Sequence, residues 1–242
     1  MTSKDKLEAP QEFRQRIEDV CETYERAQEL EAQGTHVVSC DEKTGIQALE
    51  RKAETLPPRP GKIERLEHEY IRHGTTCLRA NFFVATGEVI DSTIHATRTA
   101  EDFEAHIRKT VSSDPNAGWV FVVDQLTTHM SEELVRFVAE CCEIEDDLGV
   151  KGRRGVLKSK KTRRKFLSDK SHRIRFQYTP RHCSWMNQVE IWFSILARRV
   201  LKRSSFSSID DLQRKLLEFI QYFNAVLAKP FKWTYAGKPL RA

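Results

Sequence analysis

The 242-residue chain lacks the short motifs that mark several common protein classes. Its six cysteines include no CxxC pair and its eight histidines form no HExxH, so a zinc knuckle and a zinc protease of that type are not indicated. A GxxxxGK[ST] loop is also absent, which excludes a P-loop ATPase. The scattered cysteines are therefore expected to be reduced thiols, several of them in the core.

Long apolar runs are missing as well. No segment reaches the ~18 residues that a membrane span needs, and residues 1–6 lead into charged sequence without an apolar signal region. Hydrophobic residues are 39% of the chain and charged residues 31%, which excludes a disordered chain and a membrane protein. We expect a soluble, cytoplasmic protein with no membrane partner, large enough for one domain with a short appendage.

Positive charge is concentrated in one segment. The net charge is only +5, but residues 151–175 contain twelve Lys or Arg and a single acid, Asp169, so they carry +11 and the rest carries −6. Such a block normally repels itself and stays mobile unless an acidic partner neutralises it. It is either a solvated loop or a contact for DNA phosphates, and composition alone does not separate the two.

Hydrophobic periodicity predicts alternating helices and strands. Helices are predicted over 9–33, from Thr99, from Ser131, from about Ser184 and over about 208–228, and strands over 36–40, 76–85, 89–96, 119–123 and 174–178. Residues 46–73, which contain the proline cluster 56–61, are interpreted as a long excursion outside the core. A hairpin followed by alternating helices and strands predicts an α/β fold with a mixed sheet and helices on both faces.

Three acidic residues occupy positions typical of a ligand site. Asp41 and Asp124 directly follow buried strands, and Glu190 lies on the helix after the last short strand. Ligands of such sheets bind at the carboxyl ends of strands. Converging carboxylates without His or Cys suit Mg²⁺ or Mn²⁺, and two such ions support in-line phosphoryl displacement. Each acid alone also has a plain structural explanation, as a turn, a cap or an exposed helix charge.

The segments around these acids resemble the catalytic part of DDE transposases, in the bacterial insertion-sequence branch (IS six-thirty type) of the mariner superfamily. The resemblance runs from residue 37 to residue 240 and rests on Ser39–Gly45, Val122–His129 and Thr179–Phe193. It implies an RNase H-like fold, with a mixed five-stranded sheet flanked by helices and a basic insert before the last strand. It also implies that Asp41, Asp124 and Glu190 are the catalytic residues and metal ligands.

The same resemblance implies the reaction and its partners. It predicts Mg²⁺- or Mn²⁺-dependent DNA cleavage and strand transfer, through two ions, on element ends and target DNA, by a homodimer that is nucleoid-associated when bound to DNA. Asn187, one helical turn before Glu190, and His129 are candidates for support of the metal shell, although a structural histidine is equally expected at 129. The position of the insert, at about 146–173, favours DNA contact through Lys151, Arg153, Arg154, Lys158, Lys160, Lys161, Arg163, Arg164 and Lys165.

The expected organisation is an N-terminal helical segment (1–35), a catalytic domain (36–228) and a C-terminal tail (229–242). Members of the family carry N-terminal helix-turn-helix domains, whereas the first 35 residues here contain nine acids and five bases, a poor balance for DNA binding. A truncated, catalytically idle DNA-binding remnant is therefore the alternative, and a nuclease for RNA–DNA hybrids is a third reading. Trp192 and Phe193 are expected in the core, and Glu42 as a solvated neighbour of Asp41.

Overall fold

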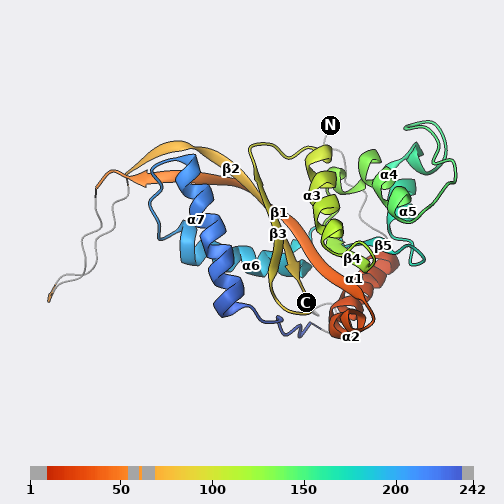
Figure 1. The fold of residues 1–242 in the computed structure, drawn as a ribbon, viewed down its shortest axis with the longest axis horizontal. Helices are drawn as coiled ribbons and strands as arrows, with labels where there is room; N and C mark the ends of the chain where they lie inside the picture. Colours follow the sequence, from red (N-terminus) through yellow and green to blue (C-terminus); the bar gives the residue numbers. More distant parts are fainter. Residues whose placement is uncertain (1–9, 54–59, 62–68, 236–242) are drawn as a thin grey trace.

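A five-stranded mixed sheet lies at the centre of the protein, as seen in a computed structural model that describes residues 10–53, 60–61 and 69–235 (Figure 1). The strand order is β3-β2-β1-β4-β5, with β2 antiparallel to both β1 and β3, and with β4 parallel to β1 and β5. The strands are β1 (Thr35–Arg51), β2 (Tyr70–Phe83), β3 (Val89–His95), β4 (Gly118–Val123) and β5 (Ile174–Tyr178). The predicted mixed α/β sheet is confirmed.

Helices cover both faces of this sheet and enclose two separate cores. One face packs against α1 (Pro10–Glu25), α2 (Ala27–Ala32), α6 (Gln188–Leu196) and α7 (Ile209–Tyr222). The other packs against α3 (Ala100–Ser113), α4 (Glu132–Cys141) and α5 (Lys160–Leu167). Within the described ranges, no helix is long and apolar enough to cross a membrane.

Alternation along β1 assigns each side chain to one face of the sheet. Val37 belongs to the core under α6, whereas Val38 and Cys40 belong to the core under α3 and α4. Because successive side chains of a strand point to opposite faces, Ser39 and Asp41 lie on the α6 face. The strand therefore directs these two polar groups toward α6.

The interpretation of residues 46–73 as an excursion outside the core is wrong at both ends. β1 continues to Arg51 and β2 already begins at Tyr70, while Ile46 and Ala48 are buried. The register of β1 on β2 shifts beside Gly45, whose φ of 64° is a conformation that glycine adopts easily. The two strands thus continue past the sheet as an arm, which Figure 1 shows extending beyond α7. The proline cluster over 56–59 lies outside the described residues.

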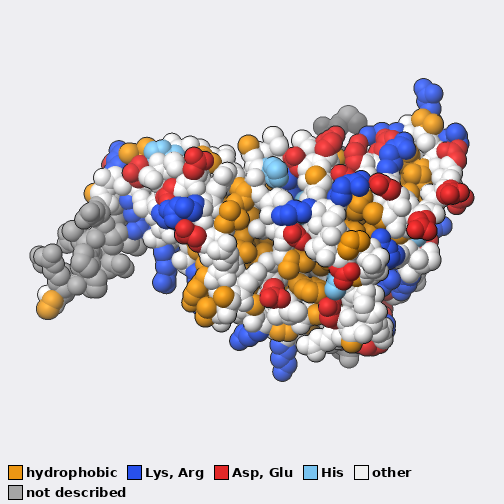
Figure 2. Space-filling view, viewed as in Figure 1, with side chains coloured by type: hydrophobic (Ala, Val, Ile, Leu, Met, Phe, Trp, Pro, Cys, Tyr) orange, Lys and Arg blue, Asp and Glu red, His pale blue; other side chains and the backbone are white. Residues whose placement is uncertain are grey.

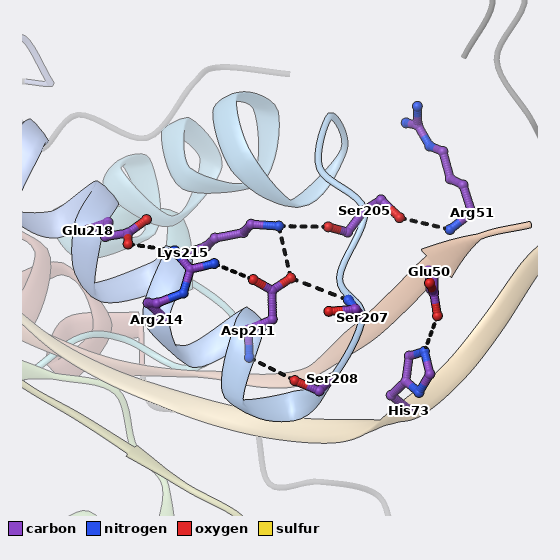
Figure 3. Close-up of polar contacts among 10 residues, drawn as sticks. All are labelled: Glu50, Arg51, His73, Ser205, Ser207, Ser208, Asp211, Arg214, Lys215 and Glu218. Carbon is purple, nitrogen blue, oxygen red and sulfur yellow. Dashed lines mark hydrogen bonds and ion pairs between the residues drawn. The ribbon is translucent and has the colours of Figure 1, made fainter. Parts of the chain in front are cut away.

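The loop before α7 contacts the outer end of the described part of this arm (Figure 3). Arg51 donates its backbone N–H to Ser205 Oγ over 2.9 Å, and Lys215 Nζ donates to the Ser205 carbonyl over 2.9 Å. Across the arm, His73 Nε2 lies 2.6 Å from a carboxylate oxygen of Glu50. The arm and the start of α7 are therefore joined through one loop.

Other elements differ from the expectation mainly at their ends. The predicted helix over 9–33 is two helices, and the helix expected from Ser184 begins with a 3₁₀ turn (Ser184–Met186) before α6. Helix starts at Thr99 and Ser131 are confirmed, because their side chains accept the backbone N–H groups of Asp102 and Leu134. Trp192 and Phe193 are buried as expected, and all six cysteines are free, four of them buried.

Candidate functional site

Strand register brings the first two acids side by side. β1 and β4 are parallel with Ser39 opposite Val122, so Asp41 and Asp124 both lie two positions beyond this last registered pair. Neighbouring strands are about 4.8 Å apart, which places the two carboxyl groups at the same end of the sheet. Burial of Asp41, together with the negative charge of Asp124, raises the pKa of Asp41 to about 7. The two acids are therefore electrostatically coupled.

Glu190 joins this pair from the first turn of α6. Its carboxyl is partly buried, and this burial, with the negative charge of Asp124, raises its pKa against the opposing effect of Lys43. The charge of Glu190 contributes in turn to the raised pKa of Asp41. The three acids predicted from the sequence thus interact, although they come from β1, the end of β4 and α6.

A buried hydrogen-bond network attaches the start of α6 to β1. Ser39 Oγ accepts the backbone N–H of Val189 over 2.9 Å and donates to Asn187 Oδ1. Asn187 Nδ2 donates to Asp41 Oδ2 over 3.1 Å and to the Cys40 carbonyl over 3.0 Å. Ser39 and Asn187 are fully buried, so these contacts hold the Asp41 carboxylate in a fixed orientation. Sequence analysis identified Asn187 but assigned no role to Ser39.

His129 holds the second acid. Its Nδ1 lies 2.8 Å from Asp124 Oδ1, and the backbone N–H of Leu126 donates to the same oxygen over 2.9 Å. Burial alone would raise the pKa of Asp124, but the hydrogen bond and charge of His129 more than offset it and lower that pKa. The imidazole is itself fully buried against Phe103, with ring centroids 4.1 Å apart. Its position is therefore fixed by packing.

The donor set fits a divalent cation. Asp41 accepts hydrogen bonds only from neutral groups in the described structure, and burial, followed by the negative charge of Asp124, raises its pKa. Oxygen-rich sites of this kind are the ones that Mg²⁺ and Mn²⁺ prefer. As the side chains are placed, no three His, Cys, Asp or Glu among the described residues are close enough to hold one ion together. A shared ion therefore requires the three carboxylates to lie closer together than they do here.

A basic cavity of about 740 Å³ opens beside Asp124. Lys160, Lys161 and Arg164 of α5 line one side, and Arg181 and His182, which follow β5, line another. The cavity thus combines one of the acids with several groups that bind phosphate. Arg181 and His182 were not assigned from the sequence, because only the fold brings the turn after β5 next to α5.

Gln125 links the walls of this cavity. Its Nε2 donates to the Thr179 carbonyl over 2.9 Å, and Arg164 Nη1 donates to its Oε1 over 3.3 Å. The amide therefore joins the ends of β4 and β5 to α5.

The basic block is more ordered than its composition predicts. Ser159 and Thr162 form a capping box at the start of α5, and Leu157 and Leu167 are fully buried. Residues 160–167 thus form a capped helix with apolar anchors on both sides, and not a loop.

Arg163 is not a surface contact as predicted. Its guanidinium is buried and donates to the carbonyls of Met130 (2.6 Å) and Leu157 (3.1 Å), which makes it an internal support of α5. The other residues of the predicted set are exposed or partly exposed: Lys151, Arg153, Arg154, Lys158, Lys160, Lys161, Arg164 and Lys165. Arg154 is engaged with Asp147, and Lys151 Nζ lies 3.7 Å from Glu132.

The environment of Glu42 differs from the expected one. It is not solvated: its side chain is 3% exposed and its Oε1 lies 2.8 Å from Nε of Arg79, a side chain that is 1% exposed. The alternation of β1 turns Glu42 to the face opposite Asp41, where the register on β2 sets it against Arg79. The two adjacent acids therefore have opposite environments.

Comparison with known families and folds gives consistent results. The family described as DDE superfamily endonuclease matches residues 36–213. No match was found among curated protein sequences. Among solved structures, the Mos1 mariner paired end complex with Mn has a TM-score of 0.54 at 13% identity, over 91% of this chain and 59% of that one.

The isolated Mos1 transposase catalytic domain, solved with raltegravir and Mn, has a TM-score of 0.52 at 10% identity, over 88% of this chain and 84% of that one. The chain spans about three-fifths of the length of the Mos1 chains in the paired-end complexes. Identities this low bear on the fold alone. The structural similarity confirms the predicted RNase H-like fold.

Proposed function

The chain belongs to the DDE superfamily of endonucleases, and on that premise we propose that it is the catalytic part of a transposase that cleaves and transfers DNA strands. One observation carries the proposal. Three acids from separate elements are electrostatically coupled at the end of the sheet, and Asp41 has no basic partner to neutralise it in the described structure. Such an arrangement is unfavourable unless a cation is bound, which supports a catalytic role over a structural one.

Asp41, Asp124 and Glu190 would hold Mg²⁺ or Mn²⁺, as two ions. The metal would supply Lewis-acid stabilisation of charge at the reacting phosphate. The rest of the work belongs to the chain: Asn187 orients Asp41, and His129 orients Asp124. Both are positioning residues, because each contacts a carboxylate and neither is placed at the substrate.

The basic cavity beside Asp124 is the proposed DNA groove. Lys160, Lys161, Arg164 and Arg181 would bind the backbone on either side of the phosphate to be cut. Lys151, Arg153, Arg154, Lys158 and Lys165 would extend the contact along the insert. Arg163 is omitted from this surface because it supports α5 from within.

The finer assignments are also part of the proposal. We assign the chain to the bacterial insertion-sequence branch, with element ends and target DNA as its substrates and two copies in the active complex. The Mos1 structures include a paired-end complex with a transposon end and a strand transfer complex, which supports DNA as the partner. The proposed catalytic domain is 36–228, preceded by a helical segment and followed by a tail.

Nicking of supercoiled DNA tests the proposal. Mn²⁺ or Mg²⁺ is titrated into the wild-type protein, Asp124→Asn and Asp146→Asn, the last being an exposed acid on the loop after α4. We expect metal-dependent nicking by the wild type and by Asp146→Asn, and none by Asp124→Asn. Nicking that persists in Asp124→Asn contradicts the assignment of the site.

The two alternatives give different outcomes in the same assay. Salt-sensitive DNA binding without nicking at any metal concentration would indicate the idle remnant. Faster cleavage of an RNA–DNA hybrid than of duplex DNA would indicate a nuclease for hybrids.

A further inference from the structure

A second cluster of positive charge lies on the far end of the helix that carries Glu190. Residues 191–209 contain no acid and four basic residues, Arg198, Arg199, Lys202 and Arg203. All four are exposed. This cluster is separate in sequence from the basic block over 151–175 and does not border the cavity beside Asp124.

Three of these residues, Arg198, Arg199 and Arg203, line a cavity of about 770 Å³ between the end of α6 and the end of α7. Arg198, Arg199, Arg203 and Lys229 provide its charge, and no acid is among the described residues that line it. In the part of the chain that is described, none of these four cations pairs with a carboxylate. The apolar lining residues are Ile195, Phe223, Val226, Leu227, Ala228 and Phe231. The alkyl stems of the arginines can lie on such a surface while the charged ends remain free.

Both helices that form the cavity end in π turns. Ala197–Leu201 continues α6, with the Lys202 N–H donating to the Ala197 carbonyl over 3.0 Å. Phe223–Leu227 continues α7, with the Ala228 N–H donating to the Phe223 carbonyl over 2.8 Å. Turns of this kind are rare and are found frequently at functional sites. Here both occur on the walls of one cavity.

The wall formed by the chain after α7 is held firmly on the sheet. Asn224 exchanges two hydrogen bonds with the backbone of Val89, of 2.9 and 2.8 Å, and the rings of Phe82 and Phe231 stack 4.5 Å apart. A Cβ at Gly87 would lie 1.9 Å from the Lys229 carbonyl oxygen, so the backbone approaches the β2–β3 turn closely. The position of Lys229 is therefore set by the fold.

The opposite wall is fixed as well. The loop that follows Arg203 is attached to the arm and to α7 through Ser205 (Figure 3).

The cavity is aligned with the acids along α6. Arg198 and Arg203 follow Glu190 by eight and thirteen residues. At the α-helical rise of 1.5 Å per residue they lie at most about 12 and 20 Å from it, because the chain leaves the α-helix after Leu196. Successive phosphates of one DNA strand are about 3.4 Å apart, so this distance corresponds to roughly four to six nucleotides.

We propose that this cavity is a second DNA-binding site, which contacts the backbone of the duplex roughly four to six base pairs from the acids. The proposal rests on the proposed function for the nature of the substrate. Charge supports DNA as the occupant: over α3 and α4, basic side chains are interspersed with acidic ones (Figure 2), and Arg108 and Arg136 pair with Glu104 and Glu132. Among the residues that the structure describes, the cations of the cavity have no such partners, as expected of groups that bind phosphate.

The salt dependence of DNA binding tests this inference. We would compare the full chain with a cavity variant (R198Q/R199Q/R203Q) and a control variant (R14Q/K109Q/R136Q), which removes three exposed charges from α1, α3 and α4. Binding of a duplex of about 30 base pairs is followed by fluorescence anisotropy without divalent metal. Each lost phosphate contact lowers the magnitude of the slope of log K against log salt by about 0.9. The magnitude should therefore fall by about 2 to 3 in the cavity variant and by less than about 1 in the control.

Two further variants identify the cause of each outcome. R198K/R199K/R203K keeps the charge and should keep the wild-type slope, so a loss there would point to packing and overturn the inference. K160Q/K161Q/R164Q tests the proposed DNA groove in parallel.

If the cavity variant keeps the wild-type slope while the groove variant has a reduced one, the second DNA-binding site is overturned. The proposed function is then unaffected, and an acidic protein segment becomes the better occupant of the cavity. A wild-type protein without salt-dependent binding overturns both.

Discussion

Asp41 and Glu42 are neighbours on one strand, yet the structure treats their charges in opposite ways. Glu42 is buried against Arg79, so its charge is balanced by a cation within 2.8 Å. Asp41 faces Asp124 and Glu190, and among the described residues its hydrogen bonds come from an amide and from the backbone. One face of the strand holds a closed ion pair, and the other holds negative charge without a counterion.

The difference separates a structural acid from a functional one. The charge of a buried ion pair is balanced within the protein, whereas clustered carboxylates of raised pKa are costly until a cation arrives. Burial alone would not have made this distinction, since both side chains are largely excluded from water. The identity of the neighbours across the sheet decides it.

Asp41→Asn should abolish function without harming the fold. Removal of one metal ligand is expected to cost about 4 kcal/mol of transition-state stabilisation, or about 10³-fold in nicking rate. The unfolding free energy without metal should stay unchanged or rise, because a repelling charge is lost. Saturating Mn²⁺ should raise the melting temperature of the wild type only. Equal stabilisation of wild type and variant by Mn²⁺ would contradict a metal site at Asp41.

Arg79→Met should give the reverse result on the other face. It leaves Glu42 buried without a partner, which costs about 3–5 kcal/mol of unfolding free energy. The double variant Glu42→Leu/Arg79→Met removes both charges and should recover most of this loss. Urea unfolding at pH 7.5 measures all three proteins. If Arg79→Met costs less than about 1 kcal/mol, the ion pair is not buried as described.

The face that holds Arg79 also contains a histidine that is kept neutral. Burial of His106, reinforced by the charges of Arg79 and Lys109, lowers its pKa to about 3, whereas an unfolded histidine titrates near 6.5. The unfolded state therefore binds a proton below about pH 6.5 that the native state does not, and stability falls as the pH is lowered from 6.5 toward 3. At pH 5 this amounts to about 2 kcal/mol.

Urea unfolding at pH 7.5 and pH 5 checks this dependence. His106→Asn keeps a group that can contact Thr93 Oγ1, which lies 3.0 Å from His106 Nδ1, but it cannot be protonated. The loss of stability between the two pH values should be smaller in the variant by about 2 kcal/mol. An equal loss in both proteins would assign the pH dependence to other groups.

The acids were accessible from sequence because they depend on local signals. Asp41 and Asp124 directly follow apolar runs that read as strands, and Glu190 follows the last strand at the start of a helix. The order of these elements also predicts the mixed sheet. Apolar runs and helix starts are encoded within a few residues and can be recognised without tertiary information, although β1 continues past Asp41 to Arg51.

The misassigned residues depend on contacts between distant segments. The partner of Glu42 is 37 residues away and is set by the register of β1 on β2, and the inward turn of Arg163 requires carbonyls of Met130 and Leu157. The continuation of β1 past Gly45 depends on a bulge that the glycine permits. A signal for Ser39 did exist: two residues before Asp41, it must share its face of the strand.

The smallest of these effects is expected at Ser39. Its substitution tests how the strand face that holds Asp41 is attached to α6. Ser39→Ala leaves the buried Val189 N–H and Asn187 Oδ1 without their partner, which should cost about 1–2 kcal/mol of unfolding free energy. Ser194→Ala is the matched control, because this exposed serine on the same helix only donates to the Glu190 carbonyl, and it should change stability by less than about 0.5 kcal/mol. Nicking should fall more in Ser39→Ala than in the control, since Asn187 then orients Asp41 less well. If Ser39→Ala matches the control in both assays, the orientation of Asp41 depends on the strand alone, and the network that joins it to α6 is dispensable.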